Sequence, residues 1–160
     1  MLRYVYALAA LLCCLVACGT EDPVDAWPEL NLLQYEVPVT VHAPAGTTVK
    51  NKNLGILQDV TLNGPEGYDV QLYVSESLGT PAVTVLADQR EEVEAMRYFA
   101  TVIEEQPDAF LFRMVVDTSN ISYDFRHVRV IGDKELVFQT GLSSHATEDE
   151  ARRMMEAVRK

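Results

Sequence analysis

The chain has 160 residues and carries 13 Lys and Arg against 24 Asp and Glu, a formal net charge of −11. This length allows one domain, because domains typically have about 100 to 150 residues. We expect no nucleic-acid partner, since phosphate contacts need clustered Lys and Arg. No Cys follows position 18, so the rest of the chain offers no thiol for a disulfide framework or a Cys-ligated zinc site.

A short positive start and a continuous apolar run open the chain. Arg3 precedes the run, which extends from Tyr4 to Cys18 and reads YVYALAALLCCLVAC. It is shorter than the about 20 residues that a membrane-spanning helix needs, and it has the flanks and length of a signal-peptide hydrophobic region. We therefore expect residues 1–17 to be a signal peptide and the mature chain to begin at Cys18.

The end of this run, LVAC at residues 15–18 followed by Gly19, resembles the lipobox of bacterial lipoproteins. The resemblance implies that the Cys18 thiol receives a diacylglycerol, that cleavage frees the amine of Cys18, and that this amine is acylated. Several acyl chains anchor a protein firmly, because each buried CH₂ contributes about 0.8 kcal/mol. An ordinary cleaved signal and a short membrane anchor are the alternatives.

Residues 18–26 are acidic and contain a Pro, which predicts a solvated tether before a single domain over 27–160. Gly19 stands where an Asp would resemble the inner-membrane retention signal of enterobacteria. The acidic residues after Cys18 resemble the export signal of Bacteroidota surface lipoproteins. We therefore expect a lipid anchor in the outer membrane, with the domain facing the periplasm or the cell surface.

The first half of the domain has the pattern of short strands separated by turns. An apolar approach segment covers residues 27–35, and alternating Val residues predict a strand over 37–41. Two further alternating runs, 55–62 and 68–75, flank the turn-forming sequence at 63–67. The spacing predicts that these two runs form a β-hairpin.

One helix and one ambiguous segment follow. Thr80 and Pro81 predict a helix start, with Thr as the N-cap and Pro as the first helical residue. Apolar residues at helical spacing extend this helix from Ala82 to about Arg97. Residues 98–105 fit either a continuation of the helix or a strand, and their alternation favours the strand.

The sequence of the second half of the domain predicts three more strands. Residues 109–117 are apolar on both faces, which is typical of a central strand. In the strand predicted over 121–130 the apolar positions change parity, which indicates a bulge near Arg126 and His127. The last strand is predicted over 135–140.

A closing helix completes the domain. Thr147 and Glu150 form a capping box, and apolar residues follow at helical spacing: Ala151, Met154, Met155 and Val158. The order of elements predicts an α+β domain with an antiparallel β-sheet or sandwich of about six to seven strands and two covering helices.

This order resembles the PsbP-like fold. The residues that carry the resemblance are VTVHAPAGTTV at 39–49, FRHVRVIGDKELVFQTGL at 125–142 and the closing helix at 146–160. The chain also resembles small uncharacterised lipoproteins of Bacteroidota. Neither resemblance supplies a catalytic residue, and a shared fold does not transfer a function.

Basic residues concentrate on the late strands of this acidic chain: Arg113, Arg126, His127 and Arg129. If these side chains share a face, they can hold an anionic ligand or a partner. Cross-strand pairing with neighbouring acidic residues is the alternative. Four aromatic residues at strand spacing are typical of a core, with a small groove as the alternative: Tyr68, Tyr73, Tyr123 and Phe125.

The sequence contains no recognisable catalytic or metal-binding motif. The three His, at 42, 127 and 145, stand in no spaced ligand pair. Ser143, Ser144 and His145 bring hydroxyls beside an imidazole, but nucleophilic catalysis also needs an acid that orients the base. We therefore expect no catalytic residue, metal or cofactor.

These patterns favour a non-catalytic binding or assembly module that contacts membrane lipid through Cys18 and binds an envelope protein. The alternative is a protein that binds a small anionic ligand or a glycan with its basic late strands. An unrecognised hydrolase is the weakest of the three hypotheses.

Overall fold

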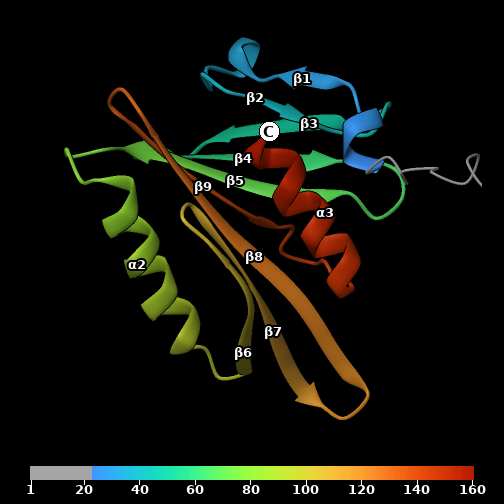
Figure 1. Ribbon diagram of the computed structural model, residues 1–160. Helices are drawn as coiled ribbons and strands as arrows, with labels where there is room; N and C mark the ends of the chain where they lie inside the picture. Colours follow the sequence, from blue (N-terminus) through green and yellow to red (C-terminus); the bar gives the residue numbers. More distant parts are fainter. Residues whose placement is uncertain (1–22) are drawn as a thin grey trace, which may run out of the picture.

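The computed structural model describes residues 23–160, so the expected signal peptide and the Cys18 lipidation site lie outside the described residues. The described part is an α+β domain with a seven-stranded sheet, a two-stranded sheet and two α-helices (Figure 1). The large sheet has the order β3-β4-β5-β9-β8-β7-β6, and every pair in it is antiparallel. The expected fold class is confirmed at this level.

The packed domain begins earlier than the sequence indicates. A 3-10 helix, η2, covers Pro23–Ala26, and Val24 is fully buried in the main core. Asp25 forms an ion pair with Lys160 at the other end of the described chain. The tether expected up to Ala26 is therefore shorter, because Val24 gains more from the core than from solvent.

A small two-stranded sheet follows η2. It pairs β1 (Glu29–Asn31) with β2 (Thr40–His42), and the 3-10 helix η3 (Leu33–Tyr35) lies between them. The segment 27–35, which was expected only as an apolar approach to the domain, therefore holds a short strand. The strand expected over 37–41 begins only at Thr40, although Val37 and Val39 are buried as their alternation predicts.

Three strands then form a meander: β3 (Thr48–Asn53), β4 (Leu57–Asn63) and β5 (Asp69–Glu76). The pairing of β4 with β5 confirms the expected hairpin. Strand β3 was not predicted, because its sequence TVKNKN has only one apolar residue. It lies at the edge of the sheet, where Lys side chains are common because they discourage pairing with another chain.

Helix α2 (Ala82–Glu94) starts later than expected, at Ala82 instead of Pro81, and it ends earlier than expected. Pro81, rather than Thr80, occupies the N-cap position, and no side chain caps the helix. The helix ends at Glu94, and β6 (Phe99–Gln106) follows. The ambiguous segment 98–105 is therefore mostly strand.

The late strands are β7 (Ala109–Asp117), β8 (Asn120–Ile131) and β9 (Lys134–Thr140). The bulge expected near Arg126 and His127 is wrong. The β7–β8 register is unbroken from Ile121 to His127, and the β8–β9 register is unbroken from His127 to Ile131. The apolar parity changes because β8 is buried on both faces, so that apolar residues are needed on each.

The two helices cover opposite faces of the large sheet. Helix α3 (Glu148–Arg159) packs with the small sheet on the side that carries Phe125 and Leu136. On the other side Val85 of α2 packs against Val128 and Val137. We call these sides the α3 face and the α2 face. Figure 1 shows the two helices on different sides of the long strands β8 and β9.

Candidate binding groove beside helix α2

The structure divides the predicted basic patch between the two faces. Side chains alternate along the regular strand β8, so Arg126 lies on the α2 face while His127 and Arg129 lie on the α3 face. Arg113 pairs in register with Tyr123, which has the parity of His127 and therefore also belongs to the α3 face. The four residues do not form one surface.

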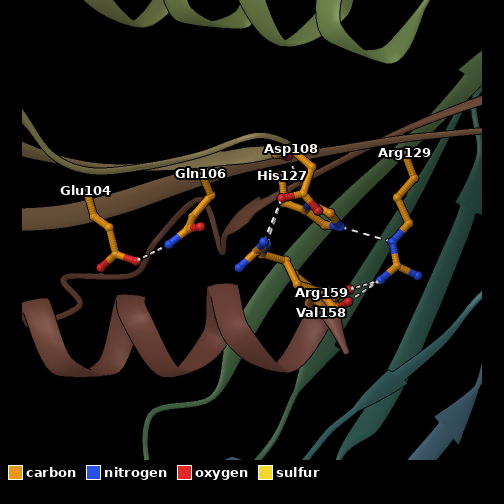
Figure 2. A network of polar contacts seen from close by, with 7 residues as sticks. All are labelled: Glu104, Gln106, Asp108, His127, Arg129, Val158 and Arg159. Atoms are coloured by element: carbon orange, nitrogen blue, oxygen red, sulfur yellow. Dashed lines mark hydrogen bonds and ion pairs between the residues drawn. The ribbon is translucent and has the colours of Figure 1, made fainter.

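His127 and Arg129 belong to a hydrogen-bond network that holds the end of α3 (Figure 2). Arg129 Nε donates to His127 Nε2 at 3.0 Å. Its Nη2 donates to the carbonyl oxygens of Val158 at 2.9 Å and Arg159 at 2.8 Å. His127 Nδ1 lies 3.0 Å from the carbonyl oxygen of Asp108. These contacts fasten the last turn of α3 to β8 and satisfy carbonyls that a helix end leaves unpaired.

The environment of His127 keeps its ring neutral. The side chain is fully buried, and this burial lowers its pKa to about 4, a shift that the nearby Arg129 and Arg159 charges reinforce. With Nε2 accepting from Arg129, the proton of the neutral ring lies on Nδ1 and is donated to Asp108. The ring also stacks on Phe138, with 5.4 Å between centroids.

Ion pairs extend this network along the same face. Burial raises the pKa of Asp108, but the hydrogen bond and charge of Arg159, at 2.8 Å, bring it below its usual range. Glu104 accepts from Gln106 Nε2 at 3.0 Å (Figure 2). Hydrogen bonds from Gln106 and then Arg152 lower the pKa of Glu104. The polar groups around His127 therefore bond to one another and hold α3 and the strands together.

Arg113 differs from the other three basic residues. It is half-buried on β7, and its Nε is buried without a hydrogen-bond partner. Of the four predicted residues, only Arg113 is therefore left to hold an anion on the α3 face, since Arg129 is held by His127 and the end of α3.

Arg126 is buried on the α2 face and its charge is compensated. Its Nη1 donates to Asp124 Oδ2 at 2.7 Å and to the carbonyl oxygen of Phe125 at 2.7 Å. The guanidinium lies over the ring of Phe112, 5.3 Å from its centroid. Asp124 also accepts from the backbone N–H and the hydroxyl of Thr140. The ion pair of Arg126 and Asp124 therefore links β8 to β9 beyond the last backbone pairing between these two strands.

Arg126 lines a cavity of about 360 Å³ between α2 and strands β4, β5 and β9, which we call the α2 groove. Its volume lies within the range of about 300 to 1,000 Å³ that small-molecule sites occupy. The groove is lined by polar, apolar and aromatic side chains: Leu57, Tyr73, Ser75, Gln89, Glu92, Met96, Arg126, Glu135, Val137 and Gln139.

Several polar side chains of the α2 groove have no protein partner. Within residues 23–160, no hydrogen bond or ion pair engages the side chains of Tyr73, Ser75, Glu135 and Gln139. Burial raises the pKa of Tyr73. Burial and the charge of Asp88 raise the pKa of Glu135. Groups that are half-buried and unpaired lack part of their hydration, so a polar ligand can satisfy them.

Two larger cavities, of about 460 and 450 Å³, lie on the other side of α2 along β6. Both are lined by Arg90, Glu94 and Glu105. Arg90 forms ion pairs with both of these carboxylates, at 2.9 Å in the case of Glu105. The charged groups that line these two cavities already pair with one another, so the α2 groove is the better candidate for a ligand site.

The remaining sequence candidates do not converge on a site. Ser143, Ser144 and His145 lie in the connection between β9 and α3, and no hydrogen bond joins their side chains in the described part of the chain. Across residues 23–160, no three His, Asp or Glu side chains gather as metal ligands. Tyr68 and Phe125 are in the core. Of the four aromatic residues, Tyr73 lines the α2 groove.

No family model, curated protein or solved structure matches this chain. No helix among residues 23–160 is long and apolar enough to cross a membrane. Function is therefore inferred from the first residues of the sequence and from the chemistry of the α2 groove.

The groove could not be predicted from the sequence, because its lining comes from separate segments. Strand pairing brings Leu57 beside Ser75 and Tyr73 beside Val137, and α2 closes the side. The one local signal was Tyr73 in an alternating strand, which equally fits a core position.

Proposed function

We propose that this protein is a cell-envelope lipoprotein, anchored through Cys18, that acts as a non-catalytic binding or assembly module. The observation that carries the proposal is the apolar run from Tyr4 to Cys18, which follows Arg3 and ends in LVAC before Gly19. This segment has the features of a signal peptide and resembles a lipobox. Membrane lipid is then one contact of the protein, and an envelope protein is the expected partner.

The early start of the domain supports a position close to the bilayer. Only residues 19–22 separate Cys18 from η2, whose Val24 is buried in the core. An extended chain spans at most about 3.6 Å per residue, so the five steps from Cys18 to Pro23 reach no more than about 18 Å. We place the protein at the outer membrane, facing the periplasm or the cell surface, where the η2 end lies nearest to the lipid.

A binding role rather than catalysis is supported by the polar chemistry of the domain. No acid is bonded to His145 in the described chain, so none orients it as a base for the nearby serines, whereas the α2 groove has the size of a ligand site. We also propose that the α+β fold is PsbP-like, from the resemblance of residues 39–49, 125–142 and 146–160. That assignment carries no photosynthetic role to this chain.

Mass spectrometry of the full chain produced in a lipoprotein-processing bacterium tests the anchor. We expect the membrane-extracted protein to begin at Cys18 and to carry a diacylglyceryl group and an N-acyl chain. The Cys18→Ser variant should stay unlipidated, and Cys14→Ser is the matched control that should mature normally. A wild-type protein that begins elsewhere, or that carries an unmodified Cys18, contradicts the proposal.

Crosslinking in intact membranes tests the partner. The wild-type protein should capture the same envelope protein in repeated preparations, and Cys18→Ser should lose that adduct because the domain leaves the bilayer. Capture that is equally strong for both proteins would show that binding does not depend on the anchor.

A further inference from the structure

The α2 groove places hydrogen-bond donors and acceptors side by side. The hydroxyls of Tyr73 and Ser75 and the amide of Gln139 can each donate and accept, and no protein group within 23–160 engages them. Glu135 adds an unpaired carboxylate. A ligand that fills the groove must therefore offer both donors and acceptors, or these groups stay desolvated at a cost.

The same cavity has apolar surface. Leu57, Met96 and Val137 line it together with the ring of Tyr73, and Met96 is 40% exposed. Aromatic rings pack against C–H groups while a Tyr hydroxyl reaches a polar partner. A sugar ring has this combination, since its C–H groups form apolar patches and its hydroxyls point outward from the edge.

The charges of the groove exclude an anion. The cation in the lining, Arg126, is paired with Asp124 at 2.7 Å. Glu92 and Glu135 line the cavity without a cation bonded to either among the described residues, and Asp88 is near enough to Glu135 to raise its pKa. An anionic ligand would meet carboxylates and no free cation.

An alkylammonium ligand fits less well than a neutral one. An ammonium group only donates hydrogen bonds, so it would leave the donors of Gln139 and Tyr73 without acceptors. Hydroxyl groups both donate and accept, so they can bond to the donors and to the acceptors of the groove.

We infer that the α2 groove is a binding site for a neutral mono- or disaccharide. This inference rests on the proposed binding role of the domain, but it does not depend on the lipid anchor. The ring of Tyr73 would pack against the sugar, and Gln139, Ser75 and Glu135 would bond to its hydroxyls.

Isothermal titration of the full-length protein, in a detergent without a sugar headgroup, tests the site with four probes: maltose, cellobiose, chitobiose and mannobiose. We expect saturable binding of at least one, with a Kd of about 1 mM or tighter. Tyr73→Ala and Gln139→Ala should each weaken this binding at least tenfold. Tyr98→Ala is the matched control, because Tyr98 is 40% exposed outside the groove, and it should leave the Kd unchanged.

Tyr73→Phe keeps the test decisive if Tyr73→Ala unfolds, since it removes only the hydroxyl and should weaken binding several-fold. No saturable binding of any of the four probes overturns the inference. So does binding that Tyr73→Ala and Gln139→Ala leave intact, or binding of sialic acid or spermidine in place of every neutral probe. If Cys18 is lipidated but no sugar binds, only the proposed sugar site is overturned. If the wild-type chain binds a sugar but is not lipidated, only the proposed lipid anchor is overturned.

Discussion

Helices α3 and α2 have almost the same length, yet they attach to the sheet in different ways. Helix α3 buries five side chains and begins with a complete capping box between Thr147 and Glu150. Arg129 bonds to the carbonyls of its last turn. Helix α2 buries only Val85 and Val93, and its N-cap Pro81 provides no side-chain bond.

The surroundings of the two helices differ accordingly. Helix α3 closes the main core, where apolar burial contributes about 25 cal/mol per Å². Helix α2 has cavities along both sides, and unpaired polar groups line one of them. The comparison indicates that the α3 face supplies stability while the α2 face keeps surface available for a ligand.

The largest difference in the free energy of unfolding should appear when a Met side chain is truncated on each of the two faces. Met155 of α3 is fully buried, whereas Met96 after α2 is 40% exposed. Met155→Ala should lower the free energy of unfolding by about 2 to 5 kcal/mol, because it leaves a cavity. Met96→Ala should cost about 0.5 kcal/mol or less. Urea denaturation of both variants checks this, and equal losses would remove the distinction between the faces.

Acid should weaken the α3 face through His127. Its pKa of about 4 in the folded protein lies below the ordinary value of 6.5, so the unfolded chain takes up the proton first as the pH falls. The stabilisation is complete above pH 6.5 and declines as the pH falls to 4, by about 3 kcal/mol in total.

Unfolding free energies measured across this pH range check the role of His127. His127→Gln should remove most of this slope, whereas His145→Gln, at an exposed position, should keep it. A wild-type slope that survives in His127→Gln would show that other groups cause the acid sensitivity.

The smallest effect concerns the helix starts. Glu150 N–H donates to Thr147 Oγ1 at 3.4 Å, and the Thr147 N–H donates to the Glu150 carboxylate at 2.8 Å. Thr147→Ala should therefore cost about 1 kcal/mol. Thr80→Ala should cost clearly less, because Pro81 rather than Thr80 is the N-cap of α2. Thermal unfolding of the pair checks this, and a larger loss for Thr80→Ala would contradict the observed start of α2.

Regular local patterns predicted much of the fold. The alternation in 68–75, the apolar run in 109–117 and the capping box at Thr147 are local signals, and each corresponds to an observed element. Strand β3 lacked that signal, because its TVKNKN sequence is held by pairing with β4 rather than by a buried face. The parity change in β8 suggested a bulge only because the sequence does not reveal that both faces are covered.

The candidate site was less predictable than the fold. The alternation rule alone would place Arg126 and Arg129 on opposite faces of a regular strand, but the expected bulge obscured this. The groove depends on strand pairing that brings Tyr73 beside Val137 and on the position of α2. Such contacts between distant segments are set by tertiary packing and leave no local pattern.

Hydrogen–deuterium exchange of the native protein tests the division of roles between the two helices most directly. We predict that amides in the middle of α3 exchange only through global unfolding, whereas those of α2 exchange through a local opening of lower free energy. Equal protection of the two helices, or weaker protection of α3, would contradict this account.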